Sequence, residues 1–178
     1  MTGTPGTGKK TVAPLAAARM GIPCASLLEQ AVAARLVGAN DRDAEVDTEA
    51  LGRFVTKRLN GPALVYGHLL PEAIGRGALR RVAVLRCEPA VLKQRLALRG
   101  YAPEKVKENV EAELIGLLSA RSAEVWGRRG VADFDTTVAP PAATAAAVAG
   151  FLSGARPGPL IDWLPAYASA SKLCSLLA

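Results

Sequence analysis

The chain has 178 residues, of which 22 are basic and 16 are acidic, and its formal net charge is +6. This length fits one compact domain and leaves no room for two sizeable ones. Half of the residues are hydrophobic and 21% are charged, which excludes an intrinsically disordered chain. The three cysteines, Cys24, Cys87 and Cys174, are far apart and form no C-x-x-C pair, so neither a disulfide framework nor a cysteine zinc site is expected. We therefore expect a reduced, cytoplasmic protein, with Cys24 and Cys87 as small buried side chains.

No membrane association is expected. The first ten residues carry glycine and lysine but no apolar segment of a secretory signal. The uncharged stretch from Thr136 to Ala155 is long enough for a span, but it consists mainly of alanine and contains Pro140 and Pro141. A helix that begins at these prolines is the better interpretation.

Helical patterns alternate with short apolar runs along the chain. Helices are predicted over residues 9–20, 27–36, 47–59, 89–99, 103–126 and 140–152, and strands over 23–26, 63–66, 82–87 and 131–135. Continuous apolar runs are typical of strands that are buried on both faces. The alternation predicts an α/β fold with a parallel sheet flanked by helices, followed by a proline-flagged tail over residues 155–178.

The strongest chemical motif stands at the beginning of the sequence. The run Gly3-Thr4-Pro5-Gly6-Thr7-Gly8-Lys9 fits the first seven positions of a P-loop, G-x-x-x-x-G-K. Glycines let backbone N–H groups turn toward a phosphate, and the following helix adds the positive end of its dipole. The Lys9 ammonium can reach the β- and γ-phosphates, so the sequence predicts a nucleotide phosphate site in a P-loop fold.

Two features depart from this motif. The position after Lys9 normally carries a serine or threonine that binds Mg²⁺, but it is Lys10 here and Thr11 follows. A P-loop also normally follows a buried strand, whereas only Met1 and Thr2 precede the glycines. The first strand therefore looks truncated, and two explanations stay open: a start farther upstream, or a sheet that lacks this strand.

Collinear motifs along nearly the whole chain resemble one protein family. The run Thr2 to Thr11 resembles the opening T-G-T-P-G-x-G-K-T-T of the archaeal adenylate kinase family, whose members are relatives of eukaryotic adenylate kinase isoenzyme 6. The family's lid segment, last strand and C-terminal tail are similar to these further segments: Val84-Leu85-Arg86, Arg95 to Glu113 (with Arg99-Gly100-Tyr101 and Glu108-Asn109-Val110-Glu111-Ala112-Glu113), Asp135-Thr136-Thr137, and Ile161-Asp162-Trp163-Leu164 with Tyr167.

The resemblance implies a nucleoside-monophosphate kinase that moves a phosphoryl group from ATP to AMP or another nucleoside monophosphate. It places the cofactor-binding positions at Gly6, Gly8, Lys9, Lys10, Thr11 and the lid arginine Arg99, with Arg95 one helical turn earlier. The kinase domain would cover residues 1–154, with a monophosphate-binding segment at about 26–49 and a lid at about 98–108. The tail, 155–178, would pack on this domain. Lysine and arginine suit phosphoryl transfer because positive charge must surround the transferring oxygens.

Two further positions bear on catalysis and on Mg²⁺. Gly67-His68 resembles the family's glycine-histidine step after its Walker B strand, which would bring His68 near the γ-phosphate as a catalytic group; a structural imidazole bonded to a backbone carbonyl is the alternative. Relatives usually carry an acid at the position of Tyr66. With Lys10 and Tyr66 in place of both metal anchors, we expect Mg²⁺ to be held mainly by the nucleotide and water, and no protein metal ligand is identified. Asp133 and Asp135 are alternative acids.

Charge is unevenly distributed. Residues 76–99 contain seven basic side chains and one acid, while residues 41–49 contain five acids (Asp41, Asp43, Glu45, Asp47 and Glu49). The acidic cluster lacks the EF-hand pattern and reads as a solvated loop. The basic segment is either a solvated helix face or a contact for phosphates or RNA.

Three functions stay in competition at this stage. The first is an adenylate-kinase-type phosphotransferase, with ATPase activity as a further expectation. The second, implied by the resemblance, is a nucleotide-binding assembly factor that contacts a small-subunit ribosomal protein and rRNA, with weak or no kinase activity. The third is a P-loop domain that binds nucleotide without turnover.

Overall fold

The computed structural model describes residues 1–37 and 46–177. The strands of this part are β1 (Thr2–Gly3), β2 (Cys24–Ser26), β3 (Leu64–Tyr66), β4 (Val82–Arg86) and β5 (Val131–Asp135). The helices are α1 (Lys9–Met20), α2 (Leu27–Ala33), α3 (Thr48–Arg58), α4 (Leu70–Ala73), α5 (Pro89–Ala97), α6 (Pro103–Leu114), α7 (Leu117–Trp126), α8 (Pro141–Leu152) and α9 (Ala170–Leu177), with 3-10 turns η1 (Arg128–Gly130) and η2 (Leu164–Tyr167). This alternation confirms the predicted α/β class.

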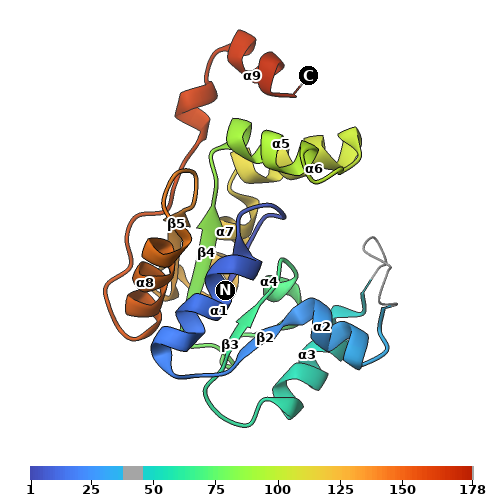
Figure 1. Cartoon of the computed structure of the whole chain (residues 1–178), viewed down its shortest axis with the longest axis vertical. Coiled ribbons are helices and arrows are strands. Elements are labelled where there is room, and N and C mark those ends of the chain that lie inside the picture. The colour runs from blue at the N-terminus through green and yellow to red at the C-terminus, as the bar shows by residue number, and fades with distance from the viewer. Residues whose placement is uncertain (38–45, 178) are drawn as a thin grey trace.

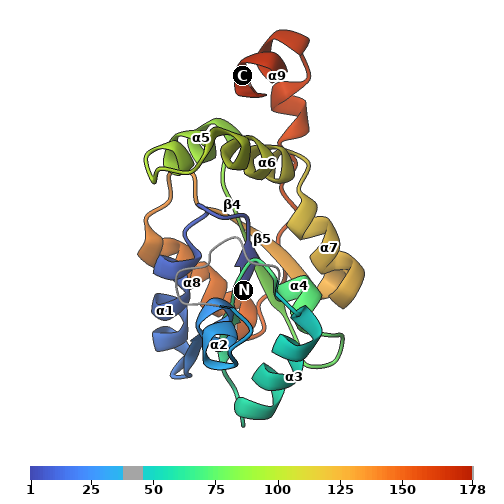
Figure 2. The ribbon, with the colours of Figure 1, turned by 90° about the vertical axis from the view of Figure 1, so that its right-hand side faces the viewer.

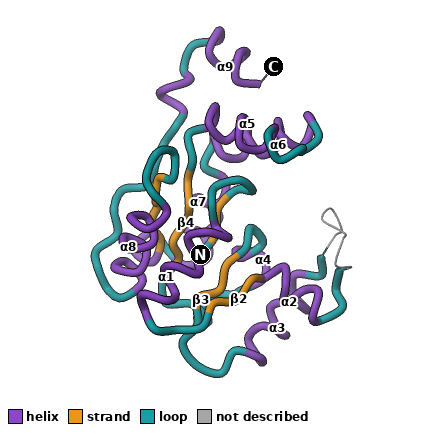
Figure 3. The backbone as a smooth tube through the Cα atoms, in the orientation of Figure 1, coloured by secondary structure: helices purple, strands orange, loops and turns teal. Residues whose placement is uncertain are grey.

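The strands form two parallel groups, β1-β4-β5 and β2-β3, and strands are drawn in orange in Figure 3. β1 pairs with β4, β4 with β5, and β2 with β3, each in parallel. The backbone nitrogen of Met1 donates to Val65 O (2.6 Å), and Gly67 N donates to Met1 O (3.2 Å). These bonds join the two groups of strands in the order β2-β3-β1-β4-β5. The explanation in which the sheet lacks its first strand is therefore wrong, because two residues suffice to fill the central position.

Helices cover both faces of the sheet (Figures 1 and 2). Successive side chains of a strand point to opposite faces. Ala83 and Leu85 of β4 accordingly join a core cluster with α1 and α8, while Val82 and Val84 join a second cluster with α2, α3 and α4. The P-loop and the elements that follow the strands thus lie at one edge of a sheet that is closed on both faces.

The predicted helix over residues 103–126 is wrong as a single element. The structure divides it into α6 and α7, and Gly116 between them has a left-handed φ of 65°. A Cβ at this glycine would lie 3.3 Å from Nη1 of Arg86. After the break the buried face changes, because α7 buries Ser119 and Ser122 while Leu117 is 38% exposed.

A third cluster joins α5, α6 and the C-terminal helix α9, which lies beyond α5 and α6 at the end of the molecule in Figure 1. Leu176 of α9 is buried among Leu92, Leu96, Val106 and Val110. The tail therefore extends the core on the side of the predicted lid.

The uncharged stretch that was weighed as a membrane span forms the loop after β5 and helix α8. No helix among the described residues is both long and apolar enough to cross a bilayer.

Candidate functional site

The glycine-rich segment from Gly3 to Lys9 connects the end of β1 to the N-terminus of α1. Gly6 and Gly8 both have a φ of 94°, which favours glycine. A Cβ at Gly6 would lie 2.6 Å from Cδ1 of Leu92. The N–H groups of Gly6, Gly8 and Lys9 make no hydrogen bond with another described residue. The loop thus offers a phosphate several backbone donors at the positive end of a helix.

The Lys9 side chain folds over this loop. Its Nζ donates to Thr4 O (3.0 Å) and to Gly3 O. Exclusion of water by the surrounding atoms lowers the pKa of Lys9 to about 7, against the opposing effect of the Glu113 carboxylate and with the help of the Arg99 charge. A phosphate beside the ammonium would favour the charged form. Lys9 is therefore an ammonium that a bound anion would stabilise.

A cavity of about 120 Å³ lies beside Lys9. It brings the P-loop together with α2, α3 and the end of β3, because its lining consists of Lys9, Lys10, Ser26, Leu27, Leu28, Ala31, Val37, Val46, Leu51, Tyr66, Gly67, His68 and Leu69. The predicted monophosphate-binding segment supplies six of these residues. Its acids Asp41, Asp43 and Glu45 lie outside the described residues. Lys10 and Thr11 are exposed on the first turn of α1, and Lys10 lines the cavity.

Tyr66 and His68 lie where β3 ends and border the same cavity. Desolvation raises the pKa of the Tyr66 hydroxyl, so this side chain is an uncharged phenol at neutral pH. Desolvation, and then the charge of Lys9, lower the pKa of His68, so its imidazole is neutral as well. The His68 side chain is exposed and follows the end of β3, so it is not a core imidazole, while a structural imidazole at the strand end stays the alternative to a catalytic one.

The two predicted lid arginines differ in their surroundings. Arg95 donates through Nη2 to Thr136 O (2.8 Å) and Thr137 O (2.9 Å), which ties α5 to the loop after β5. Arg99, in the turn after α5, is exposed, and its charge acts on Lys9. Arg99 is therefore the more exposed of the two arginines and acts on Lys9, while Arg95 holds the loop.

Sequence reasoning missed a buried ionic network below the P-loop. Arg86 is 1% exposed, and its Nε donates to Glu113 Oε1 (2.7 Å) while its Nη1 donates to Asp133 Oδ2 (3.1 Å). Thr4 of the P-loop donates to Glu113 Oε2 (2.6 Å), and Ser119 donates to Asp133 Oδ1 (2.8 Å). These bonds connect the P-loop with β4, β5, α6 and α7.

A signal for this network was present in the sequence. Glu113 follows Val106 by seven residues and Val110 by three, so helical geometry places it on the buried face of its helix. Arg86 ends a strand of otherwise apolar side chains. A carboxylate and a guanidinium at such positions need partners, because unpaired buried charges are unfavourable.

The residues around the P-loop do not fit a Mg²⁺ ion held by protein ligands. At the two expected positions, Lys10 offers an ammonium in place of a serine or threonine hydroxyl, and Tyr66 offers an uncharged phenol in place of a carboxylate. Asp133 is paired with Arg86, and Asp135 accepts hydrogen bonds from the loop that follows it. Among residues 1–37 and 46–177, no group of three or more His, Cys, Asp and Glu side chains is arranged to hold a metal.

Most of the basic segment 76–99 serves the fold. Five of its seven cations donate to acceptors within the chain, namely Arg76 to the carbonyls of Glu124 and Val125, Arg81 to those of Phe151, Gly154 and Ala155, Arg86 to the buried network, Lys93 to Leu176 O, and Arg95 to Thr136 O and Thr137 O. The acceptors of Arg76, Arg81 and Lys93 are carbonyls at helix C-termini, where cations are stabilising. The segment therefore gives little support to a contact with RNA.

Two cysteine expectations have different outcomes. Cys87 is buried, and desolvation raises the pKa of its thiol to about 11. Cys24 is exposed, so the expectation of a buried side chain is wrong there, because it begins a strand at the edge of the sheet.

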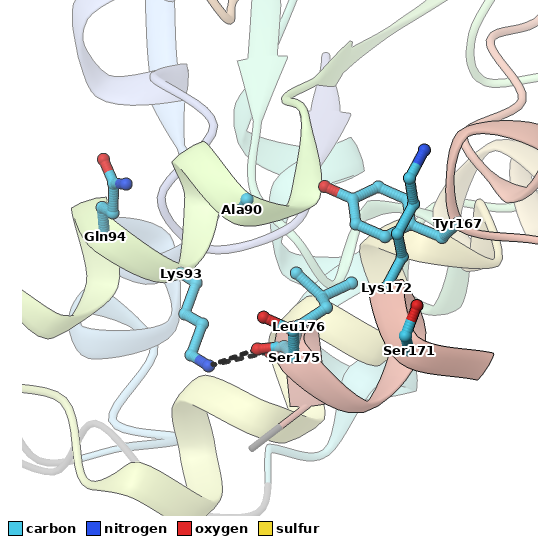
Figure 4. A pocket seen from close by; sticks show the side chains of 8 residues that line it. All are labelled: Ala90, Lys93, Gln94, Tyr167, Ser171, Lys172, Ser175 and Leu176. Carbon is cyan, nitrogen blue, oxygen red and sulfur yellow. Dashed lines mark hydrogen bonds between the residues drawn. The ribbon is translucent and has the colours of Figure 1, made fainter. Parts of the chain in front are cut away.

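A second cavity, of about 400 Å³, lies between α5 and the tail (Figure 4). Its two cations are already bonded to the backbone, Lys93 to Leu176 O (2.9 Å) and Lys172 to Ala166 O (3.2 Å). Tyr167 at its border donates to the Glu88 carboxylate. These contacts hold the tail against α5, so the cavity lies at a packing interface within the fold.

The fold and the site together define a P-loop α/β protein of the nucleotide-kinase type. A family model described as "AAA domain" matches residues 1–116. The chain is similar in fold to TT1252 from Thermus thermophilus, with a TM-score of 0.58 and 20% identity over 86% of this chain and 95% of that one.

Sequence relatives narrow this class. A protein of Pyrococcus abyssi that is named "Putative adenylate kinase" is 32% identical over 94% of this chain and 91% of its own length. A protein of the same name from Archaeoglobus fulgidus is 34% identical over 92% of this chain and 90% of its own. The chain therefore belongs to the AAA domain family, and it is similar to archaeal proteins that carry an adenylate kinase name.

Proposed function

We propose that this protein transfers the γ-phosphoryl group of ATP to AMP or another nucleoside monophosphate. The observation that carries the proposal is the cavity beside Lys9, which is lined both by the P-loop and by the segment before and after residues 38–45. A phosphotransferase needs its donor and acceptor phosphates next to each other, and this cavity adjoins the loop that would hold the donor. The names of the relatives agree with this activity.

Individual side chains take roles in this proposal. The backbone from Gly6 to Gly8 and the first turn of α1 bind the donor phosphates. Lys9 neutralises charge that develops on the transferring group, and Arg99 completes this positive environment when the lid closes. His68, as a neutral imidazole at the cavity border, orients groups near the γ-phosphate. Mg²⁺ enters with ATP rather than through protein ligands, since Tyr66 and Lys10 stand in place of the two expected ligands.

The relation to eukaryotic adenylate kinase isoenzyme 6 rests on the sequence motifs alone. The described residues give the ribosomal alternative little support, because five of the seven cations in the basic segment are bonded within the chain. Hydrolysis of ATP without an acceptor is a side reaction that a closed lid suppresses by excluding water.

The test is to quantify ADP and remaining AMP by chromatography after incubation with ATP alone and with ATP plus AMP. The proposal expects two ADP per AMP consumed and little ADP in the absence of AMP. The variant Lys9→Ala should abolish the reaction, whereas Lys57→Ala, an exposed lysine on α3, should not change it. Equal ADP formation with and without AMP would identify an ATPase instead.

A further inference from the structure

The carboxylate of Glu113 is the point where the P-loop, β4 and the tail meet. It accepts hydrogen bonds from Thr4 Oγ1 (2.6 Å), Arg86 Nε (2.7 Å), Cys87 N (3.0 Å) and Trp163 Nε1 (3.4 Å). Glu113 is 1% exposed. Four donors around a buried carboxylate, one of them a guanidinium, fix its orientation.

Thr4 is in turn the anchor of the phosphate loop. Its carbonyl oxygen accepts from Thr7 N (3.2 Å), from Thr7 Oγ1 (2.8 Å) and from Lys9 Nζ (3.0 Å). The hydroxyl of the same residue donates to Glu113. The position of the carboxylate therefore determines where the Thr4 carbonyl and the Lys9 ammonium lie.

We propose that Glu113 is a positioning residue for phosphoryl transfer, which holds the P-loop through Thr4 and acts as the negative counter-charge of Lys9. The inference rests on the proposed kinase function. Glu113 touches no substrate phosphate and acts through two residues of the loop. Because it sits in the last turn of α6, whose first residues belong to the predicted lid, it also connects the lid helix to the phosphate site.

The charge environment of Lys9 agrees with this role. The charged and titratable groups that act on Lys9, or on which Lys9 acts, are Glu113 on α6, Arg99 after α5, Lys10 on α1, His68 after β3 and the amino group of Met1. Glu113 is the one carboxylate among them, and it raises the pKa of Lys9. Loss of this charge makes the Lys9 ammonium deprotonate at a lower pH.

The chain offers a matched control in Asp133. This carboxylate is as deeply buried and pairs with the same Arg86, but its other partners are Ser119 Oγ and Ile161 N, outside the P-loop. Glu113→Gln and Asp133→Asn therefore remove equivalent charges from Arg86. Only the first removes the counter-charge of Lys9.

The experiment measures ADP affinity by calorimetry between pH 6 and pH 8 for the wild type and both variants. The ratio of the variant's Kd to the wild-type Kd at each pH is compared, because the titration of the ADP phosphates affects both proteins equally and cancels in this ratio. We expect Glu113→Gln to bind within about twofold of the wild type at pH 6 and about tenfold more weakly at pH 8, since an opposite charge nearby changes a pKa by about one unit or more. Asp133→Asn should give a ratio that is independent of pH. Equal, pH-independent losses in both variants would reduce Glu113 to a structural residue and overturn the proposal.

A milder pair of variants avoids the loss of a buried charge. Thr4→Val removes the hydroxyl while the carboxylate and Arg86 stay, and Thr4→Ser restores it. We expect Thr4→Val to lower kcat about tenfold with less than threefold change in KM for ATP, and Thr4→Ser to restore most of it. Equal kcat in the two variants contradicts the proposal. If the wild type transfers no phosphoryl group to AMP, the proposed function fails, while the ADP-binding test still decides the role of Glu113.

Discussion

The two sides of the nucleotide site differ in how they are built. On the P-loop side, Lys9 and Thr4 are enclosed by hydrogen bonds that reach down to the buried Glu113. On the opposite side, the end of β3 presents Tyr66 and the exposed His68 to a cavity with mostly apolar neighbours. Phosphate binding depends on backbone geometry and one dehydrated ammonium, whereas metal binding depends on single side chains at the surface. The first is fixed by many contacts, so a single substitution on the second side alters the site more simply.

Replacement of Lys9, on the P-loop side, should have the largest effect on phosphoryl transfer. Lys9→Ala is expected to lower phosphoryl transfer by about 10³-fold, because a preorganised positive charge next to the transferring group is lost. The thermal midpoint should not fall, since burial of an ammonium whose pKa is lowered to about 7 opposes folding at neutral pH. The measurements are the ATP plus AMP assay and a circular dichroism melt. Unchanged turnover would remove the P-loop from the mechanism.

Replacement of the lid arginine tests whether Arg99 contributes to catalysis only after the lid has closed. Arg99→Ala should lower kcat by about 10²-fold and change the Kd for ATP by less than about threefold, because the lid acts most strongly in the transition state. Arg80→Ala, an exposed arginine between α4 and β4, is the control. A variant that loses ATP affinity but keeps kcat would make Arg99 a ground-state contact.

Restoring the two expected metal ligands should give the site a protein-bound Mg²⁺ in addition to its phosphate loop. The double variant Lys10→Thr, Tyr66→Asp is expected to raise turnover about tenfold and to lower the Mg²⁺ concentration for half activity, since a positioned metal ligand contributes to transition-state stabilisation. The test is a magnesium titration of both forms with ATP and AMP. If the double variant is slower at every Mg²⁺ concentration, the Lys10 ammonium itself contributes to catalysis.

The smallest expected effect is the pH dependence of nucleotide binding, which tests the role of the Lys9 ammonium on the P-loop side. The pKa of Lys9 is about 7 without ligand, so above this pH the free protein must take up a proton before its ammonium can meet a phosphate. The protein's contribution to ADP affinity should therefore fall about tenfold between pH 6 and pH 8. Lys9→Arg stays charged over this range and reports the titration of ADP alone. Parallel profiles for the two proteins would show that Lys9 stays protonated throughout.

Much of the fold follows from local sequence. The apolar runs predict β3, β4 and β5 to within one residue. Asp47 and Thr48 are both possible caps before an amphipathic segment, and the structure shows that Asp47 caps α3. The break at Gly116 was not predicted, because Leu114 and Leu117 continue the helical spacing across it. The short helix α4 was missed too, since four residues carry no measurable periodicity.

The sequence by itself determined the phosphate loop, because seven consecutive residues suffice to specify backbone donors, a helix N-terminus and a lysine. It also determined the α/β class through the alternation of buried strands and helices. Only the tertiary structure decided which charges act together. Arg86 and Glu113 are 27 positions apart, and Thr4 and Glu113 are 109 apart, yet each pair is joined by a hydrogen bond. Long-range pairing of this kind depends on how elements pack, and no local pattern of residue types encodes it.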